Sequence, residues 1–213
     1  MENPQPGPSL SVVSVELKGA AGEAVRIHLS DGSFFILHSE IFARTSLASG
    51  STLDAETREE LLARSEQVMA RDRALSLLSR AAQTRRGLTQ KLRARGFSDP
   101  AVRHAVARME ELGYIDDRAF AEAWVRSRVA SPRDGANALY RGLRARGLAR
   151  PLAEEVLQSL YPVEDETHAG LALVRGLSKD AAIRRLAGRG FRSRTIAAVL
   201  RLMEGRDPES GGE

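Results

Sequence analysis

The sequence predicts a mainly α-helical protein, with three tandem three-helix repeats in an elongated array after a small N-terminal antiparallel β-sheet or hairpin and a linker helix. Three observations support this class. A short sequence ending in glycine and an apolar residue occurs three times, apolar residues follow it at helical spacing, and strand-like alternation is confined to the N-terminal part. A period of roughly 45 residues is typical of chained modules rather than one globular core.

The N-terminal part alternates as strands do. Residues 10–17 read LSVVSVEL and residues 25–37 read VRIHLSDGSFFIL. The pair Asp31-Gly32 between apolar runs indicates a hairpin with a type I′ turn, because both central residues of that turn must tolerate positive φ. We expect a sheet of about three strands, which is too small to be stable alone.

A linker helix is expected next, over residues 54–70, because apolar residues there keep a roughly helical spacing. Its early glutamates, Glu56, Glu59 and Glu60, suit the positive end of the helix dipole.

The repeats are recognised from three similar hexapeptides, LRARGF at 92–97, LRARGL at 143–148 and LAGRGF at 186–191. Positions five, nine and twelve residues beyond each hexapeptide are all apolar, and steps of four and three place them on one helical face. The glycine suits the left-handed conformation just past a helix C-terminus. Each repeat should therefore have a helix ending near its glycine and an amphipathic helix after it. The three glycines are Gly96, Gly147 and Gly190.

Start signals follow each glycine. The Asp99-Pro100 pair predicts a capping carboxylate before a proline at the first helical position, Pro151 repeats the proline, and Ser193 is the expected cap of the last helix. A further helix is expected before each pair, near residues 73–82, 120–129 and 169–177.

These boundaries divide the chain into a β extension, a linker helix, three repeats and two tails expected to be disordered. The segments are 1–9 (tail), 10–53 (β extension), 54–70 (linker helix), 71–113, 114–163 and 164–205 (repeats), and 206–213 (tail).

The net charge of +4 is unevenly distributed along the chain. Residues 1–69 carry a net −5, residues 71–150 a net +10 and residues 151–213 a net −1. Such a basic block favours polyanions, since Lys and Arg release condensed counterions from phosphates, although it also occurs on ordinary solvated surfaces.

Motifs for catalysis and cofactors are absent from the sequence. There is no cysteine, no phosphate-binding glycine loop, no dinucleotide fingerprint and no H-E-x-x-H, and the four histidines show no ligand spacing. We therefore expect no enzyme, no cofactor and no metal site. The N-terminus lacks the features of a signal peptide and no apolar run approaches membrane-spanning length, so we expect a cytoplasmic protein without membrane contact.

Two other features have a structural and a functional interpretation. Adjacent Asp116 and Asp117 follow Gly113 and more often cap a helix than act as acid and base, because no nucleophile or base is placed nearby. Phe120 and Trp124 are spaced i, i+4 and are expected in the core of the second repeat rather than as base-stacking platforms.

Basic residues are the candidates for binding a partner or DNA, and they form two groups. Cations in the last helical turn before a repeat glycine are explained by the helix dipole alone, whereas those nearer helix starts or turns are not. The first group is Arg93, Arg95, Arg144, Arg146 and Arg189. The second group, which we favour for binding, is Arg85, Arg86, Arg126, Arg128 and Arg133. Lys91 and Arg192 complete the candidate set.

The run MEELGYIDDRAFAEAW at residues 109–124, followed by Arg128, resembles the central signature of the RecX family. The three glycine junctions and the N-terminal strand extension are similar to that family as well, so that the resemblance covers about residues 10–205. Gly87 and Ala187-Gly188 depart from the family pattern and should loosen their helices by up to about 1 kcal/mol per glycine. The signature residues are Gly96, Gly113, Tyr114, Ile115, Asp116, Asp117, Phe120, Trp124, Gly147 and Gly190.

The resemblance implies a non-catalytic modulator of the RecA recombinase with a role in recombination, DNA repair and the SOS response. Such a protein lies along the groove of the RecA nucleoprotein filament, inhibits ATP hydrolysis and strand exchange, and binds single- and double-stranded DNA without sequence specificity. We expect a monomer. The alternative is a helix-turn-helix-like protein that acts directly on DNA, but the residues that open the post-glycine helices offer few base-reading side chains.

Overall fold

The computed structural model describes residues 9–19, 22–131 and 133–204. The chain divides into two compact units. The first contains the chain up to Ala81 together with Leu88–Tyr114, and the second contains Ala82–Gly87 together with the chain from Ile115 onward. The tails expected at 1–9 and 206–213 lie outside the described residues, except for Ser9.

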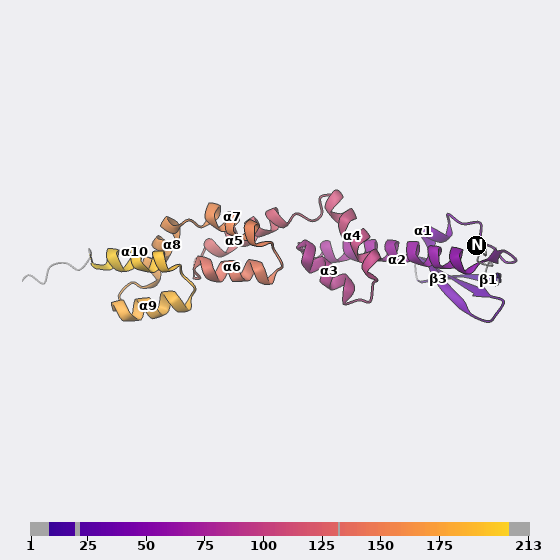
Figure 1. Cartoon of the computed structure of the whole chain (residues 1–213), viewed down its shortest axis with the longest axis horizontal. Helices are drawn as coiled ribbons and strands as arrows, with labels where there is room; N and C mark the ends of the chain where they lie inside the picture. The colour runs from indigo at the N-terminus through magenta and orange to yellow at the C-terminus, as the bar shows by residue number, and fades with distance from the viewer. Residues whose placement is uncertain (1–8, 20–21, 132, 205–213) are drawn as a thin grey trace, which may run out of the picture. The chain divides into compact units, whose positions relative to one another are not determined.

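The first unit begins with a four-stranded antiparallel sheet in the order β3-β2-β1-β4 (Figure 1). The fourth strand was not expected, because it is only two residues long and pairs with Leu10 and Ser11 alone. The short helix α1 follows β3 directly. The elements are β1 (Leu10–Lys18), β2 (Ala24–Leu29), β3 (Phe34–His38), α1 (Ser39–Phe42) and β4 (Thr52–Leu53).

The hairpin expected at Asp31-Gly32 is confirmed, but the expected turn type is wrong. Gly32 has φ +83°, whereas no described residue other than glycine, Asp31 included, has a positive φ. The Gly32 N–H donates to the Leu29 carbonyl at 3.0 Å, and the Leu29 N–H donates to the Ser33 carbonyl at 2.9 Å. This is a three-residue loop closed by a glycine bulge, and the Asp31 carboxylate accepts from the Ser33 N–H at 2.9 Å, which makes positive φ at Asp31 unnecessary.

Helix α2 (Ala55–Leu78) covers the sheet and continues beyond it. The Asp54 carboxylate caps its start by accepting from the Thr57 N–H at 2.7 Å. Leu61 and Val68 pack into the apolar core of the sheet. The expected linker helix and the first helix of the first repeat are therefore one element, because no glycine or proline separates residues 70 and 71 and nothing there breaks a helix.

The first repeat is completed by α3 (Arg85–Arg93) and α4 (Asp99–Glu111), and α4 packs along α2. The expected capping role of Asp99 is wrong, since the helix begins at Asp99 itself and Ser98 is the N-cap residue. The Ser98 N–H and hydroxyl donate to the Glu66 carboxylate of α2 at 2.7 and 2.5 Å. The Asp99 carboxylate is used instead to bind Arg93, at 2.8 Å.

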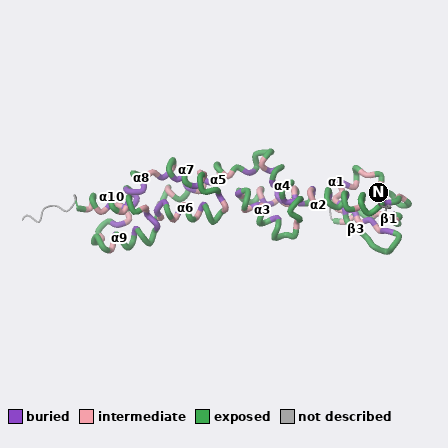
Figure 2. Tube along the Cα trace, in the orientation of Figure 1, coloured by how far each residue is buried: buried purple, intermediate pink, exposed green. Residues whose placement is uncertain are grey.

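The second unit contains six helices in its described part, and the second and third repeats share one apolar core. In Figure 2, buried and exposed positions alternate along each of these helices, as the predicted amphipathic spacing requires. Ala153 and Leu157 are buried, and Ile196 and Leu200 pack against the same core. The helices are α5 (Asp117–Val129), α6 (Ala136–Ala145), α7 (Arg150–Leu160), α8 (Val163–Leu173), α9 (Lys179–Gly188) and α10 (Ser193–Glu204).

The glycine junctions have the predicted left-handed backbone, with φ +86° at Gly96 and Gly147 and φ +74° at Gly190. At Gly190 the Phe191 N–H donates back to the Leu186 carbonyl at 3.0 Å, which closes a Schellman motif. Leu186 and Phe191 are both buried, so the repeated hexapeptide pairs the apolar residues that flank this motif. The expected capping role of Ser193 is wrong, because Ser193 is the first residue of α10 and not the residue before it.

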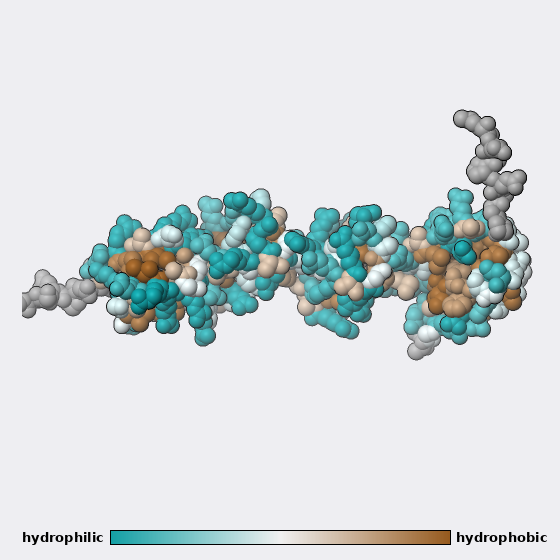
Figure 3. Space-filling view, turned by 60° about the horizontal axis from the view of Figure 1, so that its bottom comes forward, coloured by the Kyte–Doolittle hydropathy of each residue, from teal (hydrophilic) through white to brown (hydrophobic). Residues whose placement is uncertain are grey.

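Apolar side chains also reach the surface. Figure 3 shows apolar colour over the N-terminal sheet and over the third repeat, and in the first unit Phe34, Ile36 and Met69 are exposed.

None of the described helices is long and apolar enough to cross a lipid bilayer.

Candidate nucleic-acid and protein interface

Two of the arginines before the repeat glycines contact carbonyls of their own helix ends. Arg95 donates to the Lys91 carbonyl at 2.8 Å, and Arg146 donates to the Gly142 carbonyl at 2.9 Å. These two contacts agree with the dipole-based interpretation, because the last carbonyls of a helix lack intrahelical partners. Arg144 instead donates to the Leu148 carbonyl, which lies in the turn after α6.

In the second group, Arg85 and Arg86 lie at the start of α3 and Arg133 lies in the turn before α6, as the sequence suggested, whereas the other two do not. Arg126 and Arg128 lie in the last turn of α5, so the helix dipole accounts for them too. Arg126 pairs with Glu122 at 2.9 Å. Arg86 packs its aliphatic stem against Gly147, where a Cβ would lie 2.3 Å from Arg86 Cδ. Arg133 is exposed.

The remaining candidates are dispersed over the two units. Lys91 is exposed on α3, and the backbone N–H of Arg85 donates to Asp117 at 2.8 Å. Arg189 pairs with Asp134 at 3.5 Å. Ion pairing reduces the charge that such arginines present to a partner.

Trp124 holds two arginines on the surface of the second repeat. The Arg146 guanidinium lies 4.7 Å from the ring centroid and that of Arg128 lies 5.2 Å from it. Trp124 and Phe120 pack against the core but are only partly buried, so the expectation that they are core residues is met in part. Each cation–π contact contributes roughly 0.5–1 kcal/mol at an exposed site.

Some of the signature residues around the start of α5 make local backbone contacts. Gly113 has φ +73°, and the Tyr114 N–H donates to the Met109 carbonyl at 2.9 Å, which closes α4. Tyr114 is 57% exposed, whereas Ile115 is buried. The predicted capping role is confirmed for Asp116, the N-cap of α5, which accepts from the Ala119 N–H at 2.9 Å.

Glu166 has a buried carboxylate that accepts hydrogen bonds from residues of α6 and of the start of α10, and we call this set of contacts the Glu166 clasp. Glu166 is 0% exposed in the first turn of α8. Its oxygens accept from the Ala136 N–H at 2.8 Å, the Thr195 hydroxyl at 2.6 Å and the Arg192 N–H at 3.1 Å. Asp117 plays a similar part for α3, because its carboxylate accepts from the N–H of Arg85, the first residue of that helix. Ala136 is likewise the first residue of α6.

Gly135 brings the turn before α6 against the junction of the third repeat. Its N–H donates to the Arg189 carbonyl at 2.9 Å, and a Cβ there would lie 2.2 Å from the Phe191 Cα. Neither Gly135 nor Glu166 was a candidate from the sequence. Glu166 follows Glu164 and Asp165 in one helical turn, and nothing in the sequence distinguishes the buried carboxylate from the two exposed ones.

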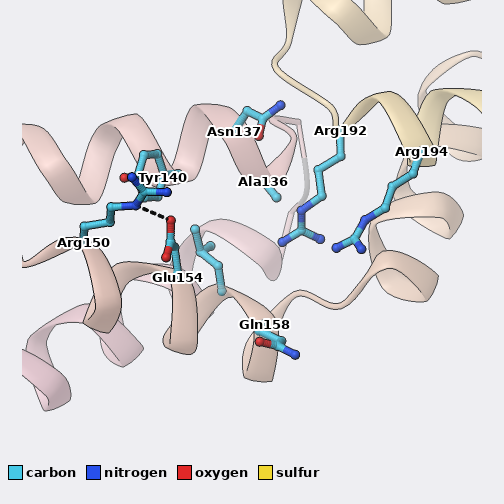
Figure 4. Close-up of a pocket in the computed structure, with 9 residues that line it drawn as sticks. Ala136, Asn137, Tyr140, Arg150, Glu154, Gln158, Arg192 and Arg194 are labelled. Atoms are coloured by element: carbon cyan, nitrogen blue, oxygen red, sulfur yellow. Dashed lines mark hydrogen bonds and ion pairs between the residues drawn. The ribbon is translucent and has the colours of Figure 1, made fainter.

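A cavity of about 630 Å³ lies between α6, α7 and the start of α10. Figure 4 shows Arg192 and Arg194 extending from the start of α10 toward the space between the other two helices. Arg150 lines the same cavity and pairs with Glu154 at 2.8 Å, and this hydrogen bond raises the pKa of Arg150. Of these three arginines, only Arg192 was a candidate from the sequence. Arg150 and Arg194 lie in the first turns of α7 and α10, and no signal in the sequence indicated that they share a cavity.

Within the described ranges, no three His, Asp or Glu side chains gather closely enough to hold a metal ion.

The chain matches two family models, one described as the first three-helix domain of RecX, over residues 70–109, and one as the second three-helix domain of RecX, over residues 116–157. The protein named Regulatory protein RecX from Streptomyces coelicolor is 35% identical over 157 residues, which cover 68% of this chain and 84% of that relative. The protein of the same name from Thermus thermophilus is 41% identical over 124 residues, which cover 55% of this chain and 80% of the relative.

Solved structures show the same fold. A crystal structure of regulatory protein RecX aligns with a TM-score of 0.67 at 19% identity, over 90% of this chain and 99% of the other. The crystal structure of RecX from Lactobacillus salivarius aligns with a TM-score of 0.62 at 21% identity, over 65% of this chain and 97% of the other.

Proposed function

This chain belongs to the RecX family of regulatory proteins, and on that premise we propose that it binds the RecA nucleoprotein filament and mainly inhibits its ATPase and recombinase activity. It does so by binding alone, without catalysis of its own. The proposal includes contact with single- and double-stranded DNA without sequence preference, as the basic charge of residues 71–150 favours.

The observation that carries the proposal is the pair of guanidinium groups held on Trp124. Arg128 and Arg146 are exposed, and neither forms an ion pair with a carboxylate of the described residues. Their neighbours on α5, Arg118 and Arg126, are both paired, with Glu155 and Glu122 respectively. Two positive charges without a carboxylate partner are therefore held together at one indole.

The indole also supports the arginines as binding groups. A side chain held over a ring loses less conformational freedom on binding than a free one, so more of its interaction energy is available for a partner. Guanidinium forks bind phosphates and carboxylates in a bidentate way, and both groups are present on a protein–DNA filament.

The test is inhibition of the DNA-dependent ATPase of RecA by the full chain and by two double variants. We expect the Arg128→Ala/Arg146→Ala variant to need roughly tenfold more protein for half-inhibition, since two charge-assisted contacts are lost. The matched control is Arg118→Ala/Arg126→Ala, which removes the same charge from paired positions and should change the midpoint by less than about threefold.

Two results would contradict the proposal at different levels. If the unmodified protein at saturating concentration leaves the ATPase and the stability of the filament unchanged, the protein is not a RecA regulator. If both double variants are equally impaired, the Trp124 surface is not the binding site.

The alternative function is direct action on DNA by a helix-turn-helix-like mechanism. It receives less support, because Asp99 and Arg150 at the starts of α4 and α7 are already paired with Arg93 and Glu154. Selection of one preferred duplex from random DNA would favour this alternative, whereas uniform, salt-sensitive binding would count against it.

A further inference from the structure

The cavity between α6, α7 and α10 has a fixed arginine in its wall. The Arg192 side chain is only 17% exposed. Its Nη1 donates to the Tyr161 carbonyl at 3.2 Å and lies 3.4 Å from the fully buried Glu166 carboxylate. Because a buried ion pair loses much of its hydration, it contributes little net stability, but it holds the guanidinium in one orientation. Arg192 is therefore a pre-oriented donor at the edge of the cavity.

Arg194 adds a charge that the described residues do not neutralise. It is exposed, lies two positions after Arg192, and forms no ion pair with a described carboxylate. The third arginine of the cavity, Arg150, is neutralised by Glu154, and Glu166 neutralises Arg192. One positive charge remains, beside the first turn of the twelve-residue helix α10, whose dipole has the same sign there. Both guanidinium groups face the same opening (Figure 4), and an anion between them would relieve their mutual repulsion.

Neutral donors occupy the opposite walls. Asn137 and Tyr140 of α6 and Gln158 of α7 also line the cavity, so two further helices contribute neutral polar side chains to it (Figure 4). A phosphate group has acceptor oxygens in several directions and can use donors from all three walls, whereas a planar carboxylate is satisfied by a single guanidinium fork. The arrangement thus fits a phosphate better than an acidic side chain.

We propose that this cavity is a binding site for a phosphodiester group of a nucleic-acid backbone, with Arg194 and Arg192 as the charged donors. The inference rests on the proposed function only in taking nucleic acid as a partner. Since the donors would contact phosphate alone, the site gives affinity without sequence preference.

The test is binding of a fluorescein-labelled oligo(dT) strand by the full chain, measured by anisotropy over a series of salt concentrations. Arg194→Ala removes the uncompensated charge without touching the Glu166 clasp. We expect about five- to tenfold weaker binding at low salt and a slope of log K against log salt that is smaller by about 0.7, the value for one phosphate contact on a single strand. The matched control is Arg201→Ala, which removes one exposed arginine from the same helix outside the cavity and should leave the slope unchanged within about 0.2.

A second variant, Gln158→Ala, removes a neutral donor and should weaken binding two- to threefold without changing the salt slope, on the order expected for one lost neutral hydrogen bond. If Arg194→Ala matches Arg201→Ala in both affinity and slope, the proposal is wrong. It is also wrong if Arg194→Ala leaves oligonucleotide binding intact but weakens inhibition of the RecA ATPase, because the cavity would then hold an acidic side chain of a protein. Failure of the proposed function gives a different result from failure of this inference. In that case the unmodified protein would bind oligo(dT) but would not inhibit the RecA ATPase.

Discussion

Replacing Glu166 by alanine should destabilise the second unit more than any change at a neighbouring carboxylate. The substitution removes the acceptor for the Ala136 N–H, the Thr195 hydroxyl and the Arg192 backbone N–H. Ala136 and Thr195 are at most 2% exposed, so water cannot replace the carboxylate at either donor.

The magnitude follows from these contacts. Each buried donor left without a partner costs about 1–3 kcal/mol, and removing one member of a buried ion pair costs about 3–5 kcal/mol. Because the Arg192 side chain is 17% exposed, it can turn partly toward water and recover some of that loss. We therefore expect a decrease of roughly 3–5 kcal/mol in the free energy of unfolding. Glu166→Gln keeps the size of the side chain and should cost about half as much, which isolates the contribution of the charge.

The assay is urea unfolding followed by the fluorescence of Trp124, the single tryptophan of the chain, which lies in the second unit and so reports on it alone. The control is Glu164→Ala, in the same helical turn but exposed, and its effect should stay below about 1 kcal/mol.

A loss below about 1 kcal/mol for Glu166→Ala would refute the reasoning. That result would mean that the donors find other partners and that the clasp contributes no stability. Equal losses at Glu164 and Glu166 would likewise show that the dipole of α8, rather than burial, determines the effect.

Three further changes test other parts of the second unit. Burial, reinforced by the negative charge of a nearby carboxylate, raises the pKa of Tyr161 from 10.0 to about 12, so the folded state keeps a proton that the unfolded chain loses, and stability should fall by about 2–3 kcal/mol between pH 10 and 12. In Tyr161→Phe this loss should disappear from urea midpoints measured across that range, and an unchanged pH profile would contradict the assignment. Gly135→Ala places a Cβ 2.2 Å from the Phe191 Cα and should cost at least about 2 kcal/mol in the same unfolding assay; a neutral result would mean that the turn can move away. Gly142→Ala places a Cβ 2.6 Å from the edge of the Trp124 ring and should shift its emission to the red, as a spectrum of the native protein would show; an unshifted spectrum would place the ring elsewhere.

Local features of the fold could be predicted because their causes are local. The left-handed glycines and the apolar spacing after them depend on residues within one helix turn or junction, and the hairpin depends on a few residues around Gly32. Predictions failed where a choice between neighbouring residues was involved. Asp99 and Ser193 are the first residues of their helices rather than the N-caps. Before Asp99, the N-cap is Ser98, which has the extended backbone that a cap requires.

The candidate site was less predictable, because its contacts join residues far apart in the chain. Arg126 and Arg128 have similar sequence surroundings, yet one is paired with Glu122 and the other lies on Trp124. Burial of Glu166 depends on α6 and α10. Its partner in α6, Ala136, is 30 residues away in the sequence, and its partner in α10, Thr195, is 29 residues away. No periodicity within α8 contains that information.

The two carboxylate clasps also make neighbouring segments non-interchangeable. Asp117 reaches the start of α3 from a partly exposed position, whereas Glu166 is fully buried and reaches the start of α6 while bound to Thr195 and Arg192 of its own repeat. A chimera that exchanged α5 and α8 would place the shorter aspartate side chain in the buried site of Glu166 and the longer glutamate side chain in the partly exposed site of Asp117. The two carboxylates are thus not interchangeable, because their sites differ in the side-chain length and the burial that they require.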